Sequence, residues 1–337
     1  MAKGLKVSLI VFVIILVLLV STVGVYFFWP WHRDFFKNAD EEFDIPGLDT
    51  EFCPQGMTEL LGYNKYLISG YMDDGSASRF YVINAETKEV EKFVTLKING
   101  KNYNGHAGGV ASYNDSIWTV SYENEVGYAF RFKVSDVLNA NNGDAVELRD
   151  KFKTQNRADY VFVHDNFVWV GEFYKPKKYE TAIEHHIETR NGEINRAMIY
   201  GFEIKENSSN GGIFDTYPAK AISVGDQCQG IAITKDGHFV VSTSYSIPNS
   251  KIYYYEDILN QTAHGTFKPG TKEISLWYLD GKSLINEEEI PSMSEELFVK
   301  NDRVYILFES ACKKYKLYNR TRLDSVYSVP VKYFAES

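Results

Sequence analysis

The chain is 337 residues long, with 44% hydrophobic and 24% charged residues. This composition is typical of globular proteins and excludes long disordered regions and fibrous repeats. The 24 Tyr and 22 Phe against 5 Met favour strands over helical bundles. The net charge is −9, and because residues 1–30 contain two Lys and no acid, the remainder carries −11. A domain this acidic binds nucleic acid poorly, so nucleic acid is not expected as a partner.

The first predicted element is a membrane anchor at residues 7–29. This stretch of 23 residues has no charge and is dense in Val, Ile, Leu and Phe, so as a helix it is long enough to cross a bilayer. Lys3 and Lys6 precede it, and the positive-inside rule therefore places the stub 1–6 in the cytoplasm. An aromatic belt follows at the far interface: Phe27, Phe28, Trp29 and Trp31.

A cleaved signal peptide is the alternative, with Thr22 and Gly24 as small residues before a cut. The apolar run continues through 25–29, further than a cleavable signal needs, and this favours the uncleaved anchor. Under either interpretation, the residues from about 31 onward lie outside the cytoplasm. We therefore expect a single-pass protein of the cell membrane, with an extracytoplasmic domain that follows a polar tether at 30–42.

After the tether, one structural unit recurs five times. Each unit has an apolar first strand, a tight turn, a second strand, and a third strand of alternating aromatic and aliphatic residues. The turns are marked by Asn64, Asp115, Asp165, Asp236 and Asp302, which lie 51, 50, 71 and 66 residues apart. Strand units with a period near 50 predict an all-β fold, a β-propeller with five four-stranded blades. A β-sandwich or several small β-domains would not require the repeated third-strand pattern.

The predicted propeller occupies 43–337. Its blades lie near 52–98, 106–154, 158–225, 227–281 and 290–332. Fourth strands are expected at 89–97, 145–152, 215–224 and 274–279, and insertions near 174–195 and 256–272 lengthen two units. The fifth unit ends without a fourth strand. Because a propeller must close its ring to hide the edge between its first and last blades, we expect residues 43–50 to supply that strand.

The face on which first strands begin and second strands end is expected to carry the functional site. Residues predicted there are polar, acidic or aromatic: Gln55, Tyr71, His106, Glu123, Asp159, Glu172, Gln229, Tyr245, Glu295 and Glu309. The insertion 174–195 joins a second strand to a third and should cap this mouth. Several carboxylates around one axis would raise one another's pKa values or bind a cation. The alternative is a mouth that is polar only because water fills it.

From these positions we predict a ligand pocket. The candidate catalytic residues are Glu172, Glu309 and Asp159, one of which would act as a general acid or base. The candidate ligand-binding residues supply hydrogen bonds or stacking surfaces: Gln55, Tyr71, His106, Gln229, Tyr245 and Glu295. The predicted function is binding of a small polar or carbohydrate-like ligand, and the residues leave open whether the protein also hydrolyses it. The alternative function is a non-catalytic protein-interaction platform at the cell envelope.

Three histidines are further candidates to contact a ligand at this mouth. Glycines flank His106 and allow an imidazole directed into the mouth, whereas a turn histidine bonded to a carbonyl is the alternative. His185 and His186 lie in the capping insertion, within a predicted short helix that places Ile183 and Ile187 on one face. Adjacent side chains point to different sides, so at most one of these histidines faces the mouth and a two-histidine metal site is not expected.

Three cysteines, Cys53, Cys228 and Cys312, also map to the mouth face. They are too few for a disulfide scaffold, and buried unpaired thiols are the default interpretation. Two alternatives stay open: a disulfide between Cys312 and one of the others across a blade boundary, or all three around a soft metal with His106.

Short segments at the ends of blade strands carry a family resemblance. They are residues 54–57, 105–109, 228–231, 242–245 and 308–310. Through them the chain resembles a group of bacterial secreted or membrane-anchored β-propeller proteins of largely uncharacterised function. More distantly it resembles the strictosidine synthase and lactonase-type propellers, which typically have six blades and a Ca²⁺ ion at the mouth. The resemblance covers about 52–332, implies a propeller fold, and makes Ca²⁺ a candidate cofactor.

Overall fold

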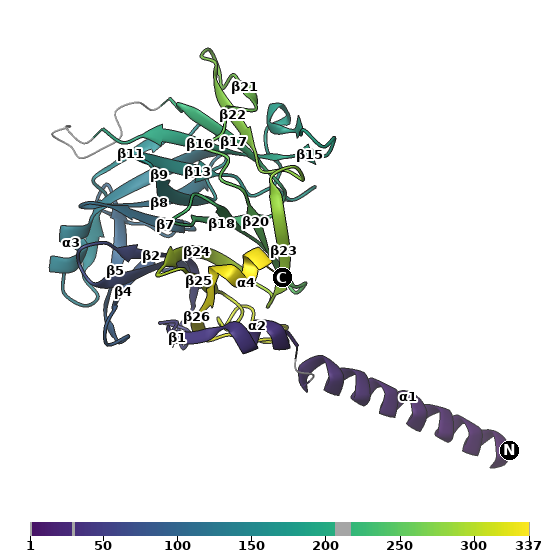
Figure 1. Cartoon of the computed structure of the whole chain (residues 1–337). Helices are drawn as coiled ribbons and strands as arrows, with labels where there is room; N and C mark the ends of the chain where they lie inside the picture. Colours follow the sequence, from purple (N-terminus) through teal and green to yellow (C-terminus); the bar gives the residue numbers. More distant parts are fainter. Residues whose placement is uncertain (1, 29–30, 206–216, 337) are drawn as a thin grey trace.

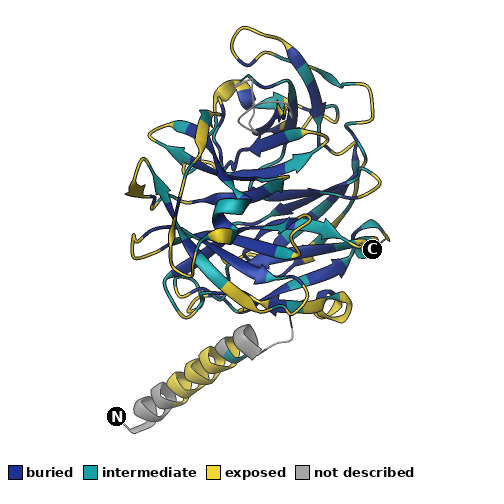
Figure 2. Ribbon diagram, turned by 90° about the vertical axis from the view of Figure 1, so that its left-hand side faces the viewer, coloured by how far each residue is buried: buried dark blue, intermediate teal, exposed yellow. Residues whose placement is uncertain are grey.

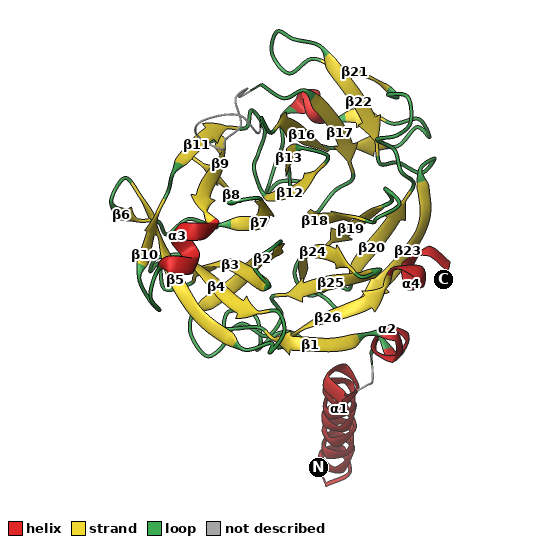
Figure 3. Cartoon of the chain, turned by 60° about the vertical axis from the view of Figure 1, so that its left-hand side comes forward, coloured by secondary structure: helices red, strands yellow, loops and turns green. Residues whose placement is uncertain are grey.

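The structure is a computed structural model that describes residues 2–28, 31–205 and 217–336. It begins with helix α1 (Ala2–Phe28), whose described side chains are those of 10–22 and 24. The following domain is built mainly from strands, which form five blade-like sheets around one axis (Figure 1, Figure 3). The predicted all-β, five-bladed propeller is confirmed.

Each sheet runs outward from a first strand at the axis. The first strands are β2 (Phe52–Leu60), β7 (Gly108–Tyr113), β12 (Tyr160–His164), β18 (Cys228–Ile233) and β24 (Ser294–Lys300). The second strands are β3 (Lys65–Met72), β8 (Ser116–Glu123), β13 (Phe167–Gly171), β19 (Phe239–Thr243) and β25 (Arg303–Phe308). The third strands are β4 (Arg79–Asn84), β9 (Val126–Lys133), β16 (Ala197–Glu203), β20 (Ser250–Tyr255) and β26 (Ser325–Pro330). Left-handed residues form the first turns, at Asn64, Asn114, Asp165, Gly237 and Asn301.

The segment predicted as one outer strand at 145–152 is two short strands in different blades. β10 (Ala145–Glu147) pairs parallel with β5 (Val90–Ile98) of the first blade, which also pairs with β6 (Lys101–Asn102). β11 (Asp150–Lys153) pairs antiparallel with β9 of the second blade. The chain divides here because α3 (Val134–Asn139) and β10 place Val137 and Val146 in the hydrophobic cluster shared by these two blades.

The strand predicted to complete the fourth blade belongs to the third. β22 (Ile274–Tyr278) pairs parallel with β17 (Lys220–Val224), and β21 (Gly265–Phe267) extends the same sheet. The outer strand of the fourth blade is β23 (Leu284–Ile290), which pairs with β20. The sequence does not indicate β23 as a strand, because it contains three consecutive Glu and Glu is depleted in strands. The blades are therefore not uniformly four-stranded: three sheets have four strands, and the first and third have six.

The ring is closed by β1 (Asp40–Asp44), which pairs antiparallel with β26 as the outer strand of the fifth blade. This strand starts three residues before the predicted segment 43–50 and ends at Asp44. Both ends of the domain are held at this closure. Phe35 of α2 (Arg33–Asn38) and Phe334 of α4 (Val331–Glu336) are buried in one cluster with residues of the fourth and fifth blades.

The hydrophobic core lies between neighbouring blades, and exposed residues are concentrated in loops and α1 (Figure 2). Each of the five buried clusters combines two adjacent blades; Trp169 of the third blade, for example, shares a cluster with Phe239 of the fourth. First strands meet closely at the axis. A Cβ on Gly56 would lie 2.5 Å from the backbone of Val110, and one on Gly230 would lie 2.7 Å from Cα of Glu296. Glycine at these positions permits the narrow ring that surrounds the mouth.

The N-terminal helix α1 leads into α2 and carries exposed aliphatic side chains at 10, 11 and 13–20. Within the residues described, no helix is both long and apolar enough to cross a bilayer. Of the predicted interfacial aromatic residues, Trp31 is described, whereas the side chains of Phe27, Phe28 and Trp29 lie outside the described part of the chain.

Candidate functional site

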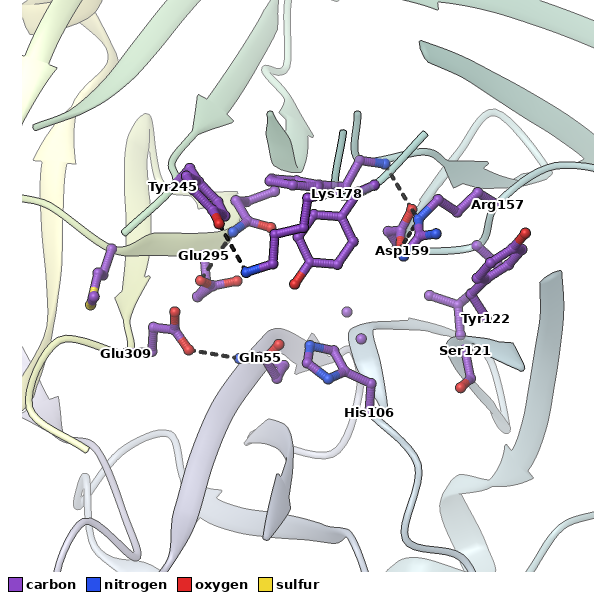
Figure 4. Close-up of a pocket in the computed structure, with 18 of the residues that line it drawn as sticks. Gln55, His106, Ser121, Tyr122, Arg157, Asp159, Lys178, Tyr245, Glu295 and Glu309 are labelled. Atoms are coloured by element: carbon purple, nitrogen blue, oxygen red, sulfur yellow. Dashed lines mark hydrogen bonds and ion pairs between the residues drawn. The ribbon is translucent and has the colours of Figure 1, made fainter. Parts of the chain in front are cut away.

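A cavity of about 380 Å³ opens at the propeller axis, on the face where the first strands begin (Figure 4). We call it the mouth. Seven of the nine predicted site residues line it: Gln55, His106, Asp159, Gln229, Tyr245, Glu295 and Glu309. They come from all five blades. The other two predicted residues, Tyr71 and Glu172, do not line it. The ring therefore brings together side chains that lie up to 254 positions apart, as between Gln55 and Glu309.

One side of the mouth carries two carboxyl groups, Glu295 and Glu309, which we call the acid pair. Glu295 is the second residue of β24, and Glu309 directly follows β25. The pairing of these two strands is irregular between Ser294 and Leu297. Such a bulge breaks the alternation of side chains, so that the consecutive residues Glu295 and Glu296 are both buried.

Two glutamines hold the acid pair. Gln55 Nε2 donates to Glu309 Oε2 at 3.0 Å, and Gln229 Nε2 donates to Glu295 Oε1 at 3.3 Å. The two carboxyls are close enough to affect each other's protonation. Burial raises the pKa of Glu295, and the neighbouring charge of Glu309 raises it further. Burial also raises the pKa of Glu309, to about 7. The acid pair therefore retains a proton near neutral pH and can both donate and accept hydrogen bonds.

Glu296 is turned away from the mouth and has a structural role. Its Oε2 accepts hydrogen bonds from the backbone N–H groups of Met57 at 2.8 Å and Val110 at 2.7 Å. These donors belong to the first strands of the first and second blades, whereas Glu296 belongs to the fifth. The carboxyl thus ties three blades together at the axis.

The opposite side of the mouth is formed by Arg157 and Asp159. Arg157 Nε lies 3.0 Å from Asp159 Oδ2, and the N–H of Phe173 donates to the same oxygen at 2.8 Å. The Arg157 guanidinium also lies 4.3 Å from the centre of the Tyr122 ring. Burial raises the pKa of Asp159 to about 7, and the Arg157 charge opposes that rise. Figure 4 shows this ion pair across the cavity from Glu309.

His106 stands on the wall of the mouth in front of Tyr71. The two rings stack with centres 4.6 Å apart, and the phenol of Tyr71 accepts a hydrogen bond from Lys314 Nζ at 2.8 Å. The His106 side chain is exposed to the cavity. The protein atoms around it reduce its hydration and lower its pKa to about 4, and the charges of Lys314 and Arg157 lower it too. The imidazole is therefore neutral at neutral pH. Tyr71 supports His106 from behind and does not offer its ring to the cavity as predicted.

Glu172 is buried outside the mouth. Its carboxylate accepts hydrogen bonds from the backbone N–H groups of Arg157 and Met198, both at 2.9 Å, and contacts His185 Nδ1 at 2.9 Å. His185 Nε2 in turn lies 2.9 Å from the Tyr200 hydroxyl. Glu172, a candidate catalytic residue from the sequence, therefore does not line the mouth, because these neighbours enclose its carboxylate.

The capping insertion contributes to the mouth with residues that the prediction missed. Lys178 and Tyr179 of the insertion line it, as does Phe173 directly before the insertion, and Lys178 Nζ donates to the Tyr245 hydroxyl at 2.9 Å. The predicted short helix is a single 3₁₀ turn, η1 (Ile183–His185), followed by the hairpin β14 (Ile187–Glu188) and β15 (Ile194–Asn195). Neither His185 nor His186 lines the mouth.

Some of the missed residues left a signal in the sequence. Arg157 precedes Asp159 by two positions, which is the spacing that places side chains on one face of an extended segment. Lys178 follows Lys175 and Lys177 in an insertion that was expected to cap the mouth. By contrast, no local pattern marks Tyr122, Tyr315 or Met293, which line the mouth because of the tertiary fold.

The three cysteines are buried free thiols. Cys53 Sγ and Cys312 Sγ lie 3.6 Å apart across the junction of the first and fifth blades, whereas Cys228 Sγ lies 3.9 Å from the Gly230 carbonyl oxygen. Among the described residues, no group of three His, Cys, Asp or Glu side chains is placed to hold a metal ion.

Neither a protein-family profile nor a curated protein sequence matches the chain. Solved structures that it resembles include the pyrroloquinoline quinone-bound aldose sugar dehydrogenase of Streptomyces coelicolor, with 10% identity, a TM-score of 0.48, and coverage of 86% of this chain and 96% of that one. Another is the glutaminyl cyclase of Myxococcus xanthus, with 9% identity, a TM-score of 0.44, and coverage of 86% and 95%. A third is the exo-β-1,3-galactanase of Phanerochaete chrysosporium with galactose, with 11% identity, a TM-score of 0.42, and coverage of 81% and 58%. Similarity at this level carries no information about substrate.

Proposed function

We propose that the mouth binds a small, neutral, polyhydroxylated ligand of the carbohydrate type, in a domain tethered at the extracytoplasmic side of the cell membrane. The observation that carries the proposal is the acid pair, Glu295 and Glu309, which faces the cavity between Gln55 and Gln229. Carboxyl and carboxamide groups both donate and accept hydrogen bonds, as vicinal hydroxyl groups require. A half-protonated pair also takes up a neutral ligand with less electrostatic cost than two carboxylates would.

The aromatic lining supports the same ligand class. Tyr122, Tyr179, Tyr245 and Tyr315 surround the cavity with rings that combine an apolar face and a polar edge. The apolar faces match the C–H surfaces of a sugar ring, and the hydroxyl groups match its polar rim. A pocket that combines aromatic faces with a few convergent polar groups is the usual form of a small-ligand site.

The charge distribution favours a neutral ligand over a strongly charged one. Arg157 is paired with Asp159, and the acid pair retains a proton. Lys178 contributes one further cation, held on the Tyr245 hydroxyl. The charges at the two sides are thus largely compensated before any ligand enters.

If the protein is hydrolytic, the acid pair would act as one unit. Glycosidases use two carboxyls roughly 5 to 9.5 Å apart that flank the scissile bond, whereas Glu295 and Glu309 lie together on one side of the mouth. The acid pair would therefore donate the proton to the leaving group, and Asp159 on the opposite side would be the second carboxyl. Among the described residues, the only acids that line the mouth are Asp159, Glu295 and Glu309.

The membrane tether is proposed from the sequence. The uncharged stretch 7–29 with Lys3 and Lys6 before it is the basis, together with the exposed aliphatic side chains of α1. This places the N-terminus in the cytoplasm and the mouth outside it.

A thermal-shift scan of the full chain in detergent tests the ligand proposal. The additions are neutral mono- and disaccharides, sugar acids, amino sugars, and, separately, Ca²⁺ and EDTA. A ligand at one hundred times its dissociation constant adds about 2.7 kcal/mol of stability, which is readily seen. We expect a shift with a neutral sugar that Glu309→Gln abolishes. A shift with Ca²⁺ alone, or with none of the sugars, would contradict the proposal.

One observation favours the alternative function, an interaction platform. On the opposite face, a cavity of about 200 Å³ is lined by mainly apolar residues, among them Leu61, Val163 and Ile233, and Leu61 is 69% exposed. A recess with an exposed apolar side chain beside it suits the insertion of a partner's side chain. Loss of partner capture on Leu61→Asp, with the mouth intact, would support this function.

A further inference from the structure

A basic and apolar loop stands at the rim of the mouth, between β25 and β26. We call residues 313–322 the basic loop. Five of its ten residues are cationic and none is acidic, in a chain with a net charge of −9: Lys313, Lys314, Lys316, Arg320 and Arg322. At its centre, Leu317 and Tyr318 are 70% and 58% exposed. Exposed apolar side chains flanked by cations are typical of segments that bind anionic membrane surfaces.

The basic loop forms part of the wall of the mouth. Tyr315 lines the cavity, and Lys314 contacts Tyr71 behind His106. In the neighbouring loop of the fourth blade, Ile247 is 39% exposed and directly follows Tyr245 and Ser246, which also line the cavity. Both of these loops, which border one side of the opening, therefore carry exposed apolar side chains.

The N-terminal segment reaches the same loops. The guanidinium of Arg320 lies 4.3 Å from the centre of the Trp31 ring and donates a hydrogen bond to Asn249. Trp31 comes two positions after the uncharged stretch 7–29. A bilayer that holds this stretch would therefore meet the basic loop, whereas Leu61 lies on the opposite face of the disc.

Part of the positive charge is compensated within the protein. Lys313 pairs with Glu51 at 3.1 Å, and Lys314 pairs with Asp73 at 2.8 Å. Lys316 is exposed, next to Leu317, and makes no ion pair among the described residues. Arg320 contacts the Trp31 indole ring and the Asn249 side-chain amide, and neither group carries a negative charge.

We propose that the basic loop docks on the anionic headgroup layer of the bilayer, so that the mouth opens toward the membrane. Leu317 and Tyr318 enter the interface, and Lys316 and Arg320 contact lipid phosphates. The orientation rests in part on the proposed tether, which brings the loop to the surface. It goes beyond the tether because a tether alone leaves the disc free to turn.

Two leucines allow a matched test in the full chain. Leu317 and Leu61 are 70% and 69% exposed and lie on opposite faces. Each is replaced in turn, Leu317→Cys and Leu61→Cys, and labelled with a polarity-sensitive fluorophore. The native cysteines are buried, and the unsubstituted chain is the labelling blank. The chains are placed in nanodiscs of phosphatidylcholine, with or without phosphatidylglycerol, that contain a lipid-attached quencher.

In anionic nanodiscs we expect a blue shift and quenching of the label at 317 and neither effect at 61. Added salt and Lys316→Glu should both weaken the quenching, because the attraction is electrostatic. Equal quenching at both positions, or quenching at 317 that is the same without phosphatidylglycerol, would overturn the proposal. A chain that enters the nanodisc with an unquenched label at 317 overturns the docking alone. A chain that associates with neither nanodisc contradicts the tether as well.

Discussion

Two buried carboxyl clusters lie in the same ring of strands and differ in where their hydrogen bonds are directed. Glu172 accepts hydrogen bonds from two backbone N–H groups and contacts His185. All of these partners belong to the protein, and Glu172 does not line the cavity. Glu295 and Glu309 accept hydrogen bonds from two carboxamides at the edge of the mouth. The first cluster is satisfied within the protein, whereas the second has capacity left for a ligand. Position on the mouth face is therefore not enough to identify a site residue.

The largest expected effect is on stability, at Glu172. In Glu172→Ala, two buried N–H groups and His185 lose their acceptor, which should cost about 3 kcal/mol or more in the free energy of unfolding. Near pH 4, where the Glu309 carboxyl is protonated, Glu309→Gln keeps the shape of the side chain and should change stability by less than about 1 kcal/mol. Urea denaturation of both variants checks this contrast. Equal losses of stability in the two variants would mean that Glu309 contributes as much to the stability of the fold as Glu172.

A second effect concerns binding. Glu309→Gln should weaken binding of a neutral sugar about tenfold or more, equivalent to about 1.4 kcal/mol, because a neutral carboxamide replaces an ionisable carboxyl and its charge-assisted hydrogen bonds to sugar hydroxyls are lost. Glu172→Gln should leave the affinity of the folded protein within about twofold. Fluorescence of the tyrosines that line the mouth gives the two affinities. A larger loss of affinity in Glu172→Gln than in Glu309→Gln would show that Glu172 takes part in ligand binding.

The acid pair also predicts a pH dependence of stability. The folded-state pKa of Glu309, about 7, lies above the unfolded value of about 4.3. The corresponding stability is fully present below pH 4.3 and is lost as pH rises through 7, by about 1.4 kcal/mol per pH unit between these values.

His106 has the opposite sign, because its pKa falls to about 4 in the folded protein. The stability from this residue is present above about pH 6.5 and is lost as pH falls toward 4. The difference between the native chain and Glu309→Gln, measured by denaturation at several pH values, isolates the carboxyl. A difference that grows toward high pH in favour of the native chain would contradict the assignment.

The smallest expected effect is at Tyr200. Tyr200→Phe removes the hydroxyl that contacts His185 Nε2 at 2.9 Å and should cost about 1 kcal/mol in stability. Sugar binding should not change, because the phenol belongs to the enclosed cluster. A shift in affinity with unchanged stability would show that this cluster communicates with the mouth.

The repeat of the first three strands could be predicted because it is written locally, in apolar alternation and in turn residues such as Asn64 and Asp165. The outer strands could not all be predicted. β22 joins the third blade through a parallel pairing with β17, a long-range contact, and the three Glu of β23 mask its alternation. Sequence spacing locates a strand without showing which sheet receives it.

For the site, the ring geometry was enough to gather seven of the nine predicted side chains at one mouth. It was not enough for Glu172 and Tyr71. Both lie where second strands end, but the fold of the capping insertion places His185 against Glu172, and Tyr71 stacks behind His106. These outcomes depend on neighbours that are distant in sequence, which no local pattern records.

The most direct test of the account is calorimetric titration of the full chain with neutral monosaccharides, in parallel with Glu309→Gln and Glu172→Gln. The account predicts saturable heat for at least one sugar with the native chain and with Glu172→Gln, and its loss with Glu309→Gln. Saturable heat that survives in Glu309→Gln but disappears in Glu172→Gln, or no heat with any sugar, would contradict the assignment of the acid pair as the ligand-binding centre.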